Sequence, residues 1–226
     1  QKILKEEQPN TSGGNGMSWT DYKSIEHIKK IRDVFKVDTF IETGTHTGIN
    51  AKLHSKNFKG IITCDIIGKC SFFGYDNIAF AEVKSKTFLK HLNRIIGNSI
   101  IYLDAHFYDP KLKQKFVVLD ELDALKGCKD CIIIIHDFDN GLGHITYDGQ
   151  SLNMDLLRKR LLKVNPNFKF YTNELSSCKI KKIEEAGSMD ELDNLKYVWS
   201  SPEKTYRGIL YCLPKEIKID GLKKIT

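Results

Sequence analysis

The feature that most constrains the fold is a series of short apolar runs that alternate with segments of helical spacing. The runs predicted as strands are 38–42, 60–65, 77–83, 99–104 and 131–137, and helical spacing covers 87–96 and 116–125. Near-continuous apolar strands are typical of sheets buried on both faces, and strand–helix alternation requires right-handed crossovers. The sequence therefore predicts a doubly wound α/β fold, with a mostly parallel, Rossmann-like sheet and helices on both faces.

The two ends of the chain differ from this central pattern. Residues 1–17 are polar and rich in glycine, so we expect a flexible leader followed by a single domain over 18–226. After a predicted helix at 151–164, the runs 167–175 and 209–213 are expected to form an antiparallel C-terminal edge of the sheet.

Composition and charge limit the possible partners. The longest purely apolar run, Ile132–Ile135, is far shorter than the roughly 20 residues of a membrane span, so no membrane partner is expected. The net charge of +6 is spread along the chain, which disfavours a nucleic-acid partner without excluding one. Cysteines in apolar runs and the absence of an apolar leader predict a cytoplasmic protein. An oligomer remains open.

Polar or glycine-rich groups follow every one of the predicted parallel strands. They are Glu42–Gly48, Asp65, Lys84–Ser85, Asp104–His106 and His136–Asp137. Ligands of open α/β sheets bind at the carboxyl ends of the strands, and a buried polar group is costly unless it is paired or hydrated. The sequence therefore predicts one ligand site at this edge of the sheet.

The first of these loops excludes two common nucleotide motifs. Glu42-Thr43-Gly44-Thr45-His46-Thr47-Gly48 contains neither the GxxxxGK of a P-loop nor the GxGxxG of a dinucleotide site. Glu42 would repel phosphate, while Gly44 and Gly48 let the backbone approach a ligand closely. Asp65, about twenty residues further on, is suited to accept hydrogen bonds from ribose hydroxyls. A ligand that joins a ribose to a cationic amino acid fits these residues better than NAD or ATP.

This loop and Asp65 resemble the first two motifs of the class I S-adenosylmethionine-dependent methyltransferases, over roughly residues 38–137. The resemblance implies that Gly44 and Thr45 contact the methionine part of the cofactor, Asp65 the ribose, and Lys84 and Ser85 the adenine side. A plain helix N-cap is an equal alternative for Ser85. The implied cofactor-binding set is Glu42, Thr43, Gly44, Thr45, His46, Gly48, Asp65, Lys84, Ser85 and Asp104.

Within that class, the fourth and fifth strand ends are most similar to metal-dependent sugar and macrolide O-methyltransferases and their cephalosporin-hydroxylase-like relatives. Those proteins carry Asp-Gly-Asp and Asp-Asp where this chain has Asp104-Ala105-His106 and His136-Asp137. The resemblance implies a catalytic group of Asp104, His106 and His136, and a divalent metal (Mg, Mn or Fe) on Asp104, His136 and Asp137. In a metal-free alternative, His106 or His136 is the general base.

The leading hypothesis is thus an S-adenosylmethionine-dependent methyltransferase that modifies a hydroxyl of a small molecule or sugar, with or without a metal. One alternative is a non-catalytic cofactor-binding or assembly protein of the same fold. Another is a metal-dependent hydroxylase or hydrolase that does not use S-adenosylmethionine. Residues 147–150 are candidates for the substrate pocket, with an ordinary turn as an equal alternative. Asp120, Glu121 and Asp123 are expected to be solvated.

Overall fold

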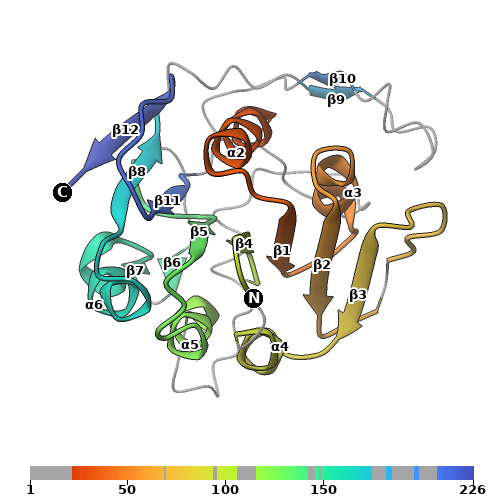
Figure 1. The fold of residues 1–226 in the computed structure, drawn as a ribbon, viewed down its shortest axis with the longest axis horizontal. Coiled ribbons are helices and arrows are strands. Elements are labelled where there is room, and N and C mark those ends of the chain that lie inside the picture. Colours follow the sequence, from red (N-terminus) through yellow and green to blue (C-terminus); the bar gives the residue numbers. More distant parts are fainter. Residues whose placement is uncertain are drawn as a thin grey trace.

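The computed structural model of the chain contains one large mixed sheet, two short hairpins and helices on both sides of the sheet (Figure 1). It describes residues 22–68, 70–93, 96–105, 116–141, 146–147, 149–174, 182–184, 196–198 and 208–226. The helices are α2 (Tyr22–Phe35), α3 (Ile49–Ser55), α4 (Ser85–Leu92), α5 (Val117–Ala124) and α6 (Met154–Val164). The strands are β1 (Thr39–Thr43), β2 (Gly60–Asp65), β3 (Ile78–Glu82), β4 (Ser99–Leu103), β5 (Cys131–Ile135), β6 (Thr146–Tyr147), β7 (Gln150–Ser151), β8 (Lys169–Asn173), β9 (Lys182–Glu184), β10 (Lys196–Val198), β11 (Leu210–Leu213) and β12 (Leu222–Ile225).

The eight strands of the large sheet lie in the order β12-β8-β11-β5-β4-β1-β2-β3. The five strands predicted in the first part of the chain pair in parallel, as expected. Because β1 has β2 on one side and β4 on the other, the direction of winding reverses between β1 and β4. Such a reversal point is where an open α/β sheet binds its ligands.

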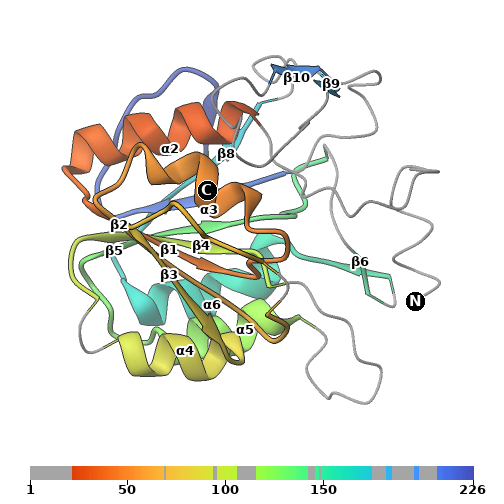
Figure 2. The ribbon, with the colours of Figure 1, turned by 90° about the vertical axis from the view of Figure 1, so that its right-hand side faces the viewer.

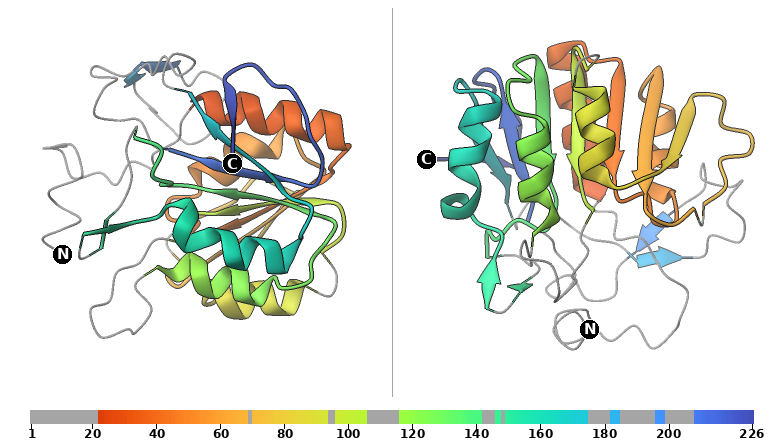
Figure 3. Two further views of the ribbon diagram at one scale, coloured as in Figure 1. Left: turned by 90° about the vertical axis from the view of Figure 1, so that its left-hand side faces the viewer. Right: turned by 90° about the horizontal axis from the view of Figure 1, so that it is seen from below.

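Two apolar cores cover the two faces of the sheet. Helices α2 and α3 lie on one face, and α4, α5 and α6 lie on the other (Figures 2 and 3). The spacing of Ile28 and Ile31 on α2 places both in the first core, while Leu122 of α5 and Leu157 of α6 lie in the second. Strands β4 and β5, in the middle of the sheet, are buried along their whole length. The predicted doubly wound α/β class is confirmed.

The antiparallel C-terminal part of the sheet is also confirmed, and the structure adds two features to it. Strand β11 is inserted between β5 and β8 and is antiparallel to both. Strand β12, which the sequence did not predict, pairs with β8 and forms the outer edge. Its weak signal is understandable, because an edge strand whose two central residues are exposed lysines has little apolar character.

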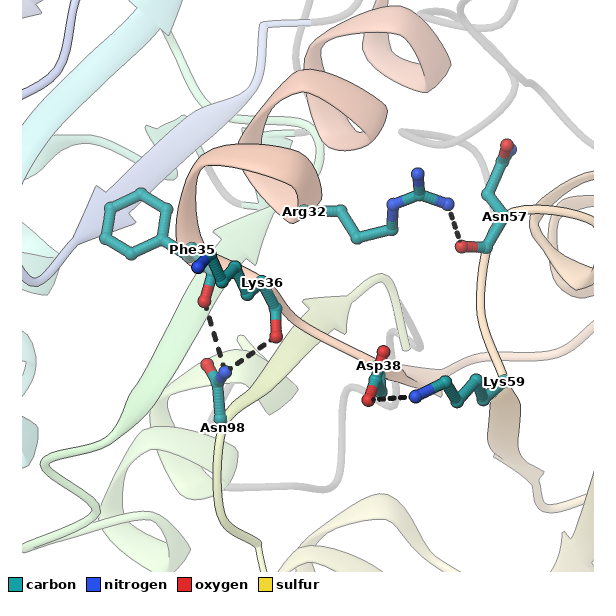
Figure 4. A network of polar contacts seen from close by, with 7 residues as sticks. All are labelled: Arg32, Phe35, Lys36, Asp38, Asn57, Lys59 and Asn98. Atoms are coloured by element: carbon teal, nitrogen blue, oxygen red, sulfur yellow. Dashed lines mark hydrogen bonds and ion pairs between the residues drawn. The ribbon is translucent and has the colours of Figure 1, made fainter.

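The amino-terminal edge of the sheet is occupied by structural contacts. The side-chain amide of Asn98 donates to the carbonyls of Phe35 and Lys36 at 3.1 and 3.0 Å, and these bonds hold the end of α2 against the start of β4 (Figure 4). Lys59 pairs with Asp38 at 2.7 Å on the same edge. These contacts join elements at the edge opposite the one where open α/β sheets bind ligands.

Two expectations about local structure need correction. Helix α4 begins at Ser85, two residues earlier than predicted, and its N-cap is Lys84, so Ser85 is not a cap. Glu121 is fully buried and not solvated, because it lies on the same face of α5 as Val118 and Leu122.

Among the residues described, no helix combines the length and the apolar character that crossing a membrane requires.

Candidate active site

The glycine loop after β1 packs directly against the end of β4. A β-carbon at Gly44 would lie 2.4 Å from the carbonyl oxygen of Asp104, and Gly44 has a φ of +81°. The backbone amide of Asp104 in turn donates to the carbonyl of Thr43 at 3.2 Å. Only glycine allows the two strand ends to approach this closely. The loop and Asp104, which were predicted to share a site, therefore lie side by side at the reversal point.

The backbone of the loop turns through several left-handed residues. Gly48 has a φ of +75° and His46 a φ of +48°. A β-carbon at Gly48 would lie 2.8 Å from the ring of Phe72, in the connection between β2 and β3. A non-glycine residue in this region is uncommon and often marks a functional site. The loop is thus a tight backbone cradle closed on one side by the β2–β3 connection.

Glu42 supports this loop from below. Its side chain is 1% exposed and accepts hydrogen bonds from Asn50 at 2.7 Å and from Thr63 at 2.8 Å. The hydroxyl of Thr63 also contacts that of Thr45 at 2.6 Å, so the network reaches the loop itself. Glu42 was predicted among the cofactor-binding residues, and the structure places it beneath the loop, where it positions the backbone.

Burial raises the pKa of Glu42 to about 8. The hydrogen bonds from Asn50 and Thr63 oppose this rise, and the negative charges of Asp104 and Asp65 add to it. Glu42 is therefore mostly neutral at pH 7. The expectation that Glu42 repels phosphate is therefore not met at neutral pH, because a neutral carboxyl carries no charge.

Asp65, at the end of β2, is connected to the glycine loop. One carboxylate oxygen accepts a hydrogen bond from the backbone amide of His46 at 2.8 Å, and the other accepts one from Ile67 at 3.3 Å. A carboxylate has about four acceptor positions, so these two bonds orient Asp65 and still leave it able to accept hydroxyl protons. Asp65, the residue predicted to bind the ribose, is thus fixed beside the glycine loop.

Asp104, His136 and Asp137 form one cluster at the ends of β4 and β5. The Nδ1 atom of His136 lies 3.0 Å from Asp104 and 3.4 Å from a carboxylate oxygen of Asp137. Parallel pairing of β4 with β5 brings them together, and Asp137 has a φ of +56°, a left-handed conformation that aspartate tolerates better than most residues. The residues predicted to be catalytic or to bind a metal therefore lie together, except His106, which is outside the described residues.

The two carboxylates determine the charge of His136. Burial by itself lowers the pKa of this imidazole, but the negative charges of Asp104 and Asp137 outweigh burial and raise the pKa to about 10. His136 is therefore an imidazolium at neutral pH, and its Nδ1 proton is held by carboxylates. A histidine in this state can stabilise negative charge, and it acts as a base only after losing that proton.

The same cluster fits a divalent ion. One ligand atom from each of Asp104, His136 and Asp137 lies within 4.8 Å of the other two. Two carboxylate oxygens and one imidazole nitrogen suit Mn²⁺ or Fe²⁺ and leave positions for other ligands. Because imidazole binds a metal only when neutral, metal binding here would release the Nδ1 proton.

The residues that follow β3 were predicted to lie on the adenine side of the cofactor. Lys84 is exposed, while Ser85 is 8% exposed and begins α4.

The sequence did not identify Glu121 of α5 as part of this region. Neither of its carboxyl oxygens has a hydrogen-bond partner in the part of the chain that the structure describes. Burial raises its pKa to about 7; the nearby hydroxyls of Ser85 and Thr43 oppose this rise, and Asp104 adds to it.

Glu121, Asn50 and Thr63 are the site residues that sequence reasoning missed. Helical periodicity could have revealed Glu121, since it lies three residues after Val118 and four before Leu125, both of which are buried. Asn50 and Thr63 gave no such signal, because only the packing of α3 and β2 against β1 brings them to Glu42.

The two buried glutamates should make stability depend on pH. Each is neutral in the folded protein with a pKa of about 8 (Glu42) or 7 (Glu121), whereas the ordinary value is 4.5. The stabilisation of the fold by each carboxyl is complete below pH 4.5. It is lost as the pH rises through the folded-state pKa, which is about 8 for Glu42 and about 7 for Glu121. We expect each to lower the free energy of unfolding by about 1.4 kcal/mol per pH unit within its range.

Urea titrations between pH 5 and pH 8 check this expectation. Glu42→Gln should remove one part of the slope and Glu121→Gln the other, because an amide does not ionise. Glu216→Gln is the matched control, since Glu216 pairs with Lys224 on the surface. Equal slopes in the wild type and both buried variants would contradict the prediction.

The sheet can now be compared with known proteins. Its mostly parallel strand order with an antiparallel β11 is that of a doubly wound, Rossmann-like α/β sheet. No protein-family model and no curated protein matches the chain.

Solved structures do match. A SAM-dependent methyltransferase from Anabaena variabilis is 12% identical, with 88% of this chain and 87% of that chain covered and a TM-score of 0.48. One from Archaeoglobus fulgidus is 13% identical, with coverage of 83% and 93% and a TM-score of 0.46. At these identities the likeness concerns the fold alone.

Proposed function

We propose that this protein is an S-adenosylmethionine-dependent methyltransferase that modifies a hydroxyl group. The observation that carries the proposal is the position of Asp104. Its backbone packs against Gly44 of the cradle, and its carboxylate contacts His136 of the second cluster. A ligand in the cradle and a group activated by the cluster would thus meet at one residue.

The cradle is suited to a cationic nucleoside. Gly44 and Gly48 let the loop pack directly against Asp104 and Phe72, where a β-carbon would clash, and Asp65 can accept bonds from ribose hydroxyls. Asp65 and Asp104 favour a positive ligand and disfavour phosphate. When bound, S-adenosylmethionine supplies an activated methyl group on a sulfonium.

The cluster supplies the second half of the chemistry. Methyl transfer requires a nucleophile that has lost, or is losing, its proton. Asp104 is the carboxylate of the cluster whose backbone contacts the cradle, so we assign it as proton acceptor or positioning group for the acceptor hydroxyl. The imidazolium of His136 holds Asp104 in place and stabilises its charge. A divalent ion on Asp104, His136 and Asp137 would instead lower the pKa of the hydroxyl directly.

Calorimetric titration with S-adenosylmethionine and S-adenosylhomocysteine tests the proposal, with and without Mg²⁺, Mn²⁺ and Fe²⁺. We expect both nucleosides to bind at one site. A flat response to both under every condition would refute the proposal. Tight metal retention with no response to either nucleoside would favour the hydroxylase or hydrolase alternative. Binding without transfer to any acceptor would favour a cofactor-binding protein.

Asp65→Asn should weaken the binding of both nucleosides by about tenfold, because hydrogen bonds to a charged acceptor are roughly twice as strong as neutral ones. The amide keeps one oxygen for the His46 amide, so the loop should remain in place. Asp38→Asn, at the opposite edge of the sheet, is the matched control and should bind like the wild type. Dissociation constants from the same titrations give the comparison.

A further inference from the structure

The outer edge of strand β3 is an unpaired edge of the large sheet. In the part of the chain that the structure describes, β3 pairs with β2 alone and is the last strand on that side (Figures 1 and 3). Ala79 and Glu82 are exposed, and Ile78, Phe80 and Ala81 are half-buried. We propose that this edge pairs with the β3 edge of a second copy of the chain, in an antiparallel register centred on Phe80. Such pairing does not depend on the proposed function.

The two edges of the sheet differ in how they are protected. Natural proteins commonly protect an edge strand with lysines, proline or bulges, because its unpaired N–H and C=O groups can pair with another chain. The two central residues of β12, Lys223 and Lys224, are exposed lysines. Strand β3 has the sequence Ile-Ala-Phe-Ala-Glu, with no lysine and no proline. The β3 edge is therefore the one open to pairing.

Two backbone hydrogen bonds show which residues of β3 face outward. The amide of Ile61 donates to the carbonyl of Asn77, and the amide of Val83 donates to the carbonyl of Asp65, both at 2.8 Å. Backbone groups of a strand point alternately to its two sides, so the odd-numbered residues from 77 to 83 bond to β2. The residues whose backbone groups face outward are Ile78, Phe80 and Glu82.

A register centred on Phe80 pairs these outward-facing groups with each other. Phe80 then lies opposite Phe80 of the partner subunit, and Ile78 lies opposite Glu82 of the partner subunit. Both are pairs of outward-facing residues, as the hydrogen-bonded pairs of antiparallel strands require. The amide of Ile78 already donates to the carbonyl of Tyr75 at 3.3 Å, so the new donors are the amides of Phe80 and Glu82. The two copies thereby form one continuous sheet.

The charges next to β3 favour this register over its neighbours. Asp76 and Lys84 are exposed, and neither forms an ion pair with another residue that the structure describes. In the register centred on Phe80, Asp76 lies opposite Lys84 of the partner subunit, and the two-fold axis repeats this pair. A shift by two residues in one direction places Asp76 opposite Glu82 of the partner subunit, where like charges repel. The opposite shift places Lys84 opposite the apolar Ile78.

The β3 edge is complementary to itself, which indicates a second copy as the partner. A two-fold contact uses the same surface on both subunits, so each group must find its complement within that surface. Asp76 and Lys84 supply opposite charges at the two ends of the strand. The β2–β3 connection, next to this edge in Figure 1, carries three of the five large apolar side chains that are exposed among the described residues: Ile66, Ile67 and Phe73. Exposed apolar side chains that cluster in this way are typical of a protein interface.

Sedimentation of the full chain and amide exchange followed by NMR test this pairing. Between about 1 μM and about 1 mM protein, we expect the mass to rise from that of one chain to that of two. The amides of Phe80 and Glu82 should exchange rapidly in the dilute sample and about tenfold or more slowly in the concentrated one. The amides of Ala79 and Ala81, which face β2, should be protected in both samples.

Charge reversal tests the register. Asp76→Lys places two lysines opposite each other at both ends of the interface and should raise the dissociation constant of the dimer by about tenfold or more. Asp76→Lys combined with Lys84→Asp exchanges the two charges, so the double variant should dimerise like the wild type. Asp130→Lys, at an exposed site in the turn before β5, is the matched control and should leave the dissociation constant unchanged. Thermal unfolding shows whether each variant is folded.

A single-chain mass at every concentration would overturn the inference, and so would assemblies that grow beyond two chains. A dimer whose Phe80 and Glu82 amides stay unprotected would use another interface. A dimer that is unchanged by Asp76→Lys, or not restored in the folded double variant, would contradict the register. The amide measurements need only the wild type, so they decide the outcome even if a variant does not fold. None of these measurements involves S-adenosylmethionine, so their result is independent of the proposed function.

Discussion

Gly44→Ala should abolish detectable binding of S-adenosylmethionine and S-adenosylhomocysteine while the chain still folds. The new methyl group would lie 2.4 Å from the carbonyl oxygen of Asp104, at a φ of +81°. The left-handed backbone alone costs about 1–2 kcal/mol for a residue with a β-carbon. The clash adds to this cost and can be relieved only if the loop moves away from β4, which removes the cradle. We expect a loss of affinity of at least about a hundredfold.

Gly127→Ala is the matched control for this prediction. Gly127 has a φ of +84°, close to that of Gly44, but a β-carbon there would meet nothing within 4 Å. It therefore suffers the same backbone cost without the clash and should bind both nucleosides normally. Calorimetry gives the affinities, and thermal unfolding shows whether each variant is folded. Wild-type affinity in Gly44→Ala would mean that the loop is not the cofactor cradle.

Asp104→Asn should have the second large effect, because Asp104 belongs to both halves of the site. The amide oxygen can still accept the bond from His136, but the charge that raises the pKa of His136 from its ordinary value of 6.5 to about 10 is halved. We expect the titration midpoint of His136 to fall by about one unit or more. Methyl transfer to an acceptor should fall by about 10²–10⁴-fold, as is typical when a group that handles the proton is lost.

NMR titration of labelled histidines checks the first part of this prediction without an acceptor. Asp123→Asn, on the exposed side of α5, should leave the midpoint of His136 unchanged. The wild type should also be more stable than Asp104→Asn at neutral pH. A raised pKa stabilises the fold fully below pH 6.5, and this contribution is lost as pH rises through 10. An unchanged midpoint in Asp104→Asn would show that Asp104 does not control the charge of His136.

Much of the fold and part of the site could be predicted from local patterns. Apolar runs such as Cys131–Ile135 indicate buried strands, and the alternation with helices indicates a parallel sheet. Since carboxyl ends of parallel strands share an edge, the residues that follow the strands were expected to gather there. Asp65 does contact the loop that contains His46, and Asp104 does contact His136.

The remaining parts depend on contacts between distant segments. The sequence placed Glu42 among the cofactor-binding residues, but it gave no sign that Asn50 and Thr63 bind this carboxyl in the interior. Glu121 was expected to be solvated like its acidic neighbours, but the packing of α5 against the sheet buries it. The sequence of β12 has little apolar character, and this strand forms because it pairs with β8 at the edge of the sheet.

The sequence alone was enough for the α/β class, the parallel order of the first strands and the set of polar groups at one edge, because periodicity and strand ends are local properties of the chain. Only the tertiary structure placed β11 between β5 and β8 and brought the carboxylates of Asp104 and Asp137 to one imidazole. These features depend on register and packing between segments far apart in the chain. Their free energies are those of burial and of charge pairing, and neither can be read from the neighbours of a residue in the sequence.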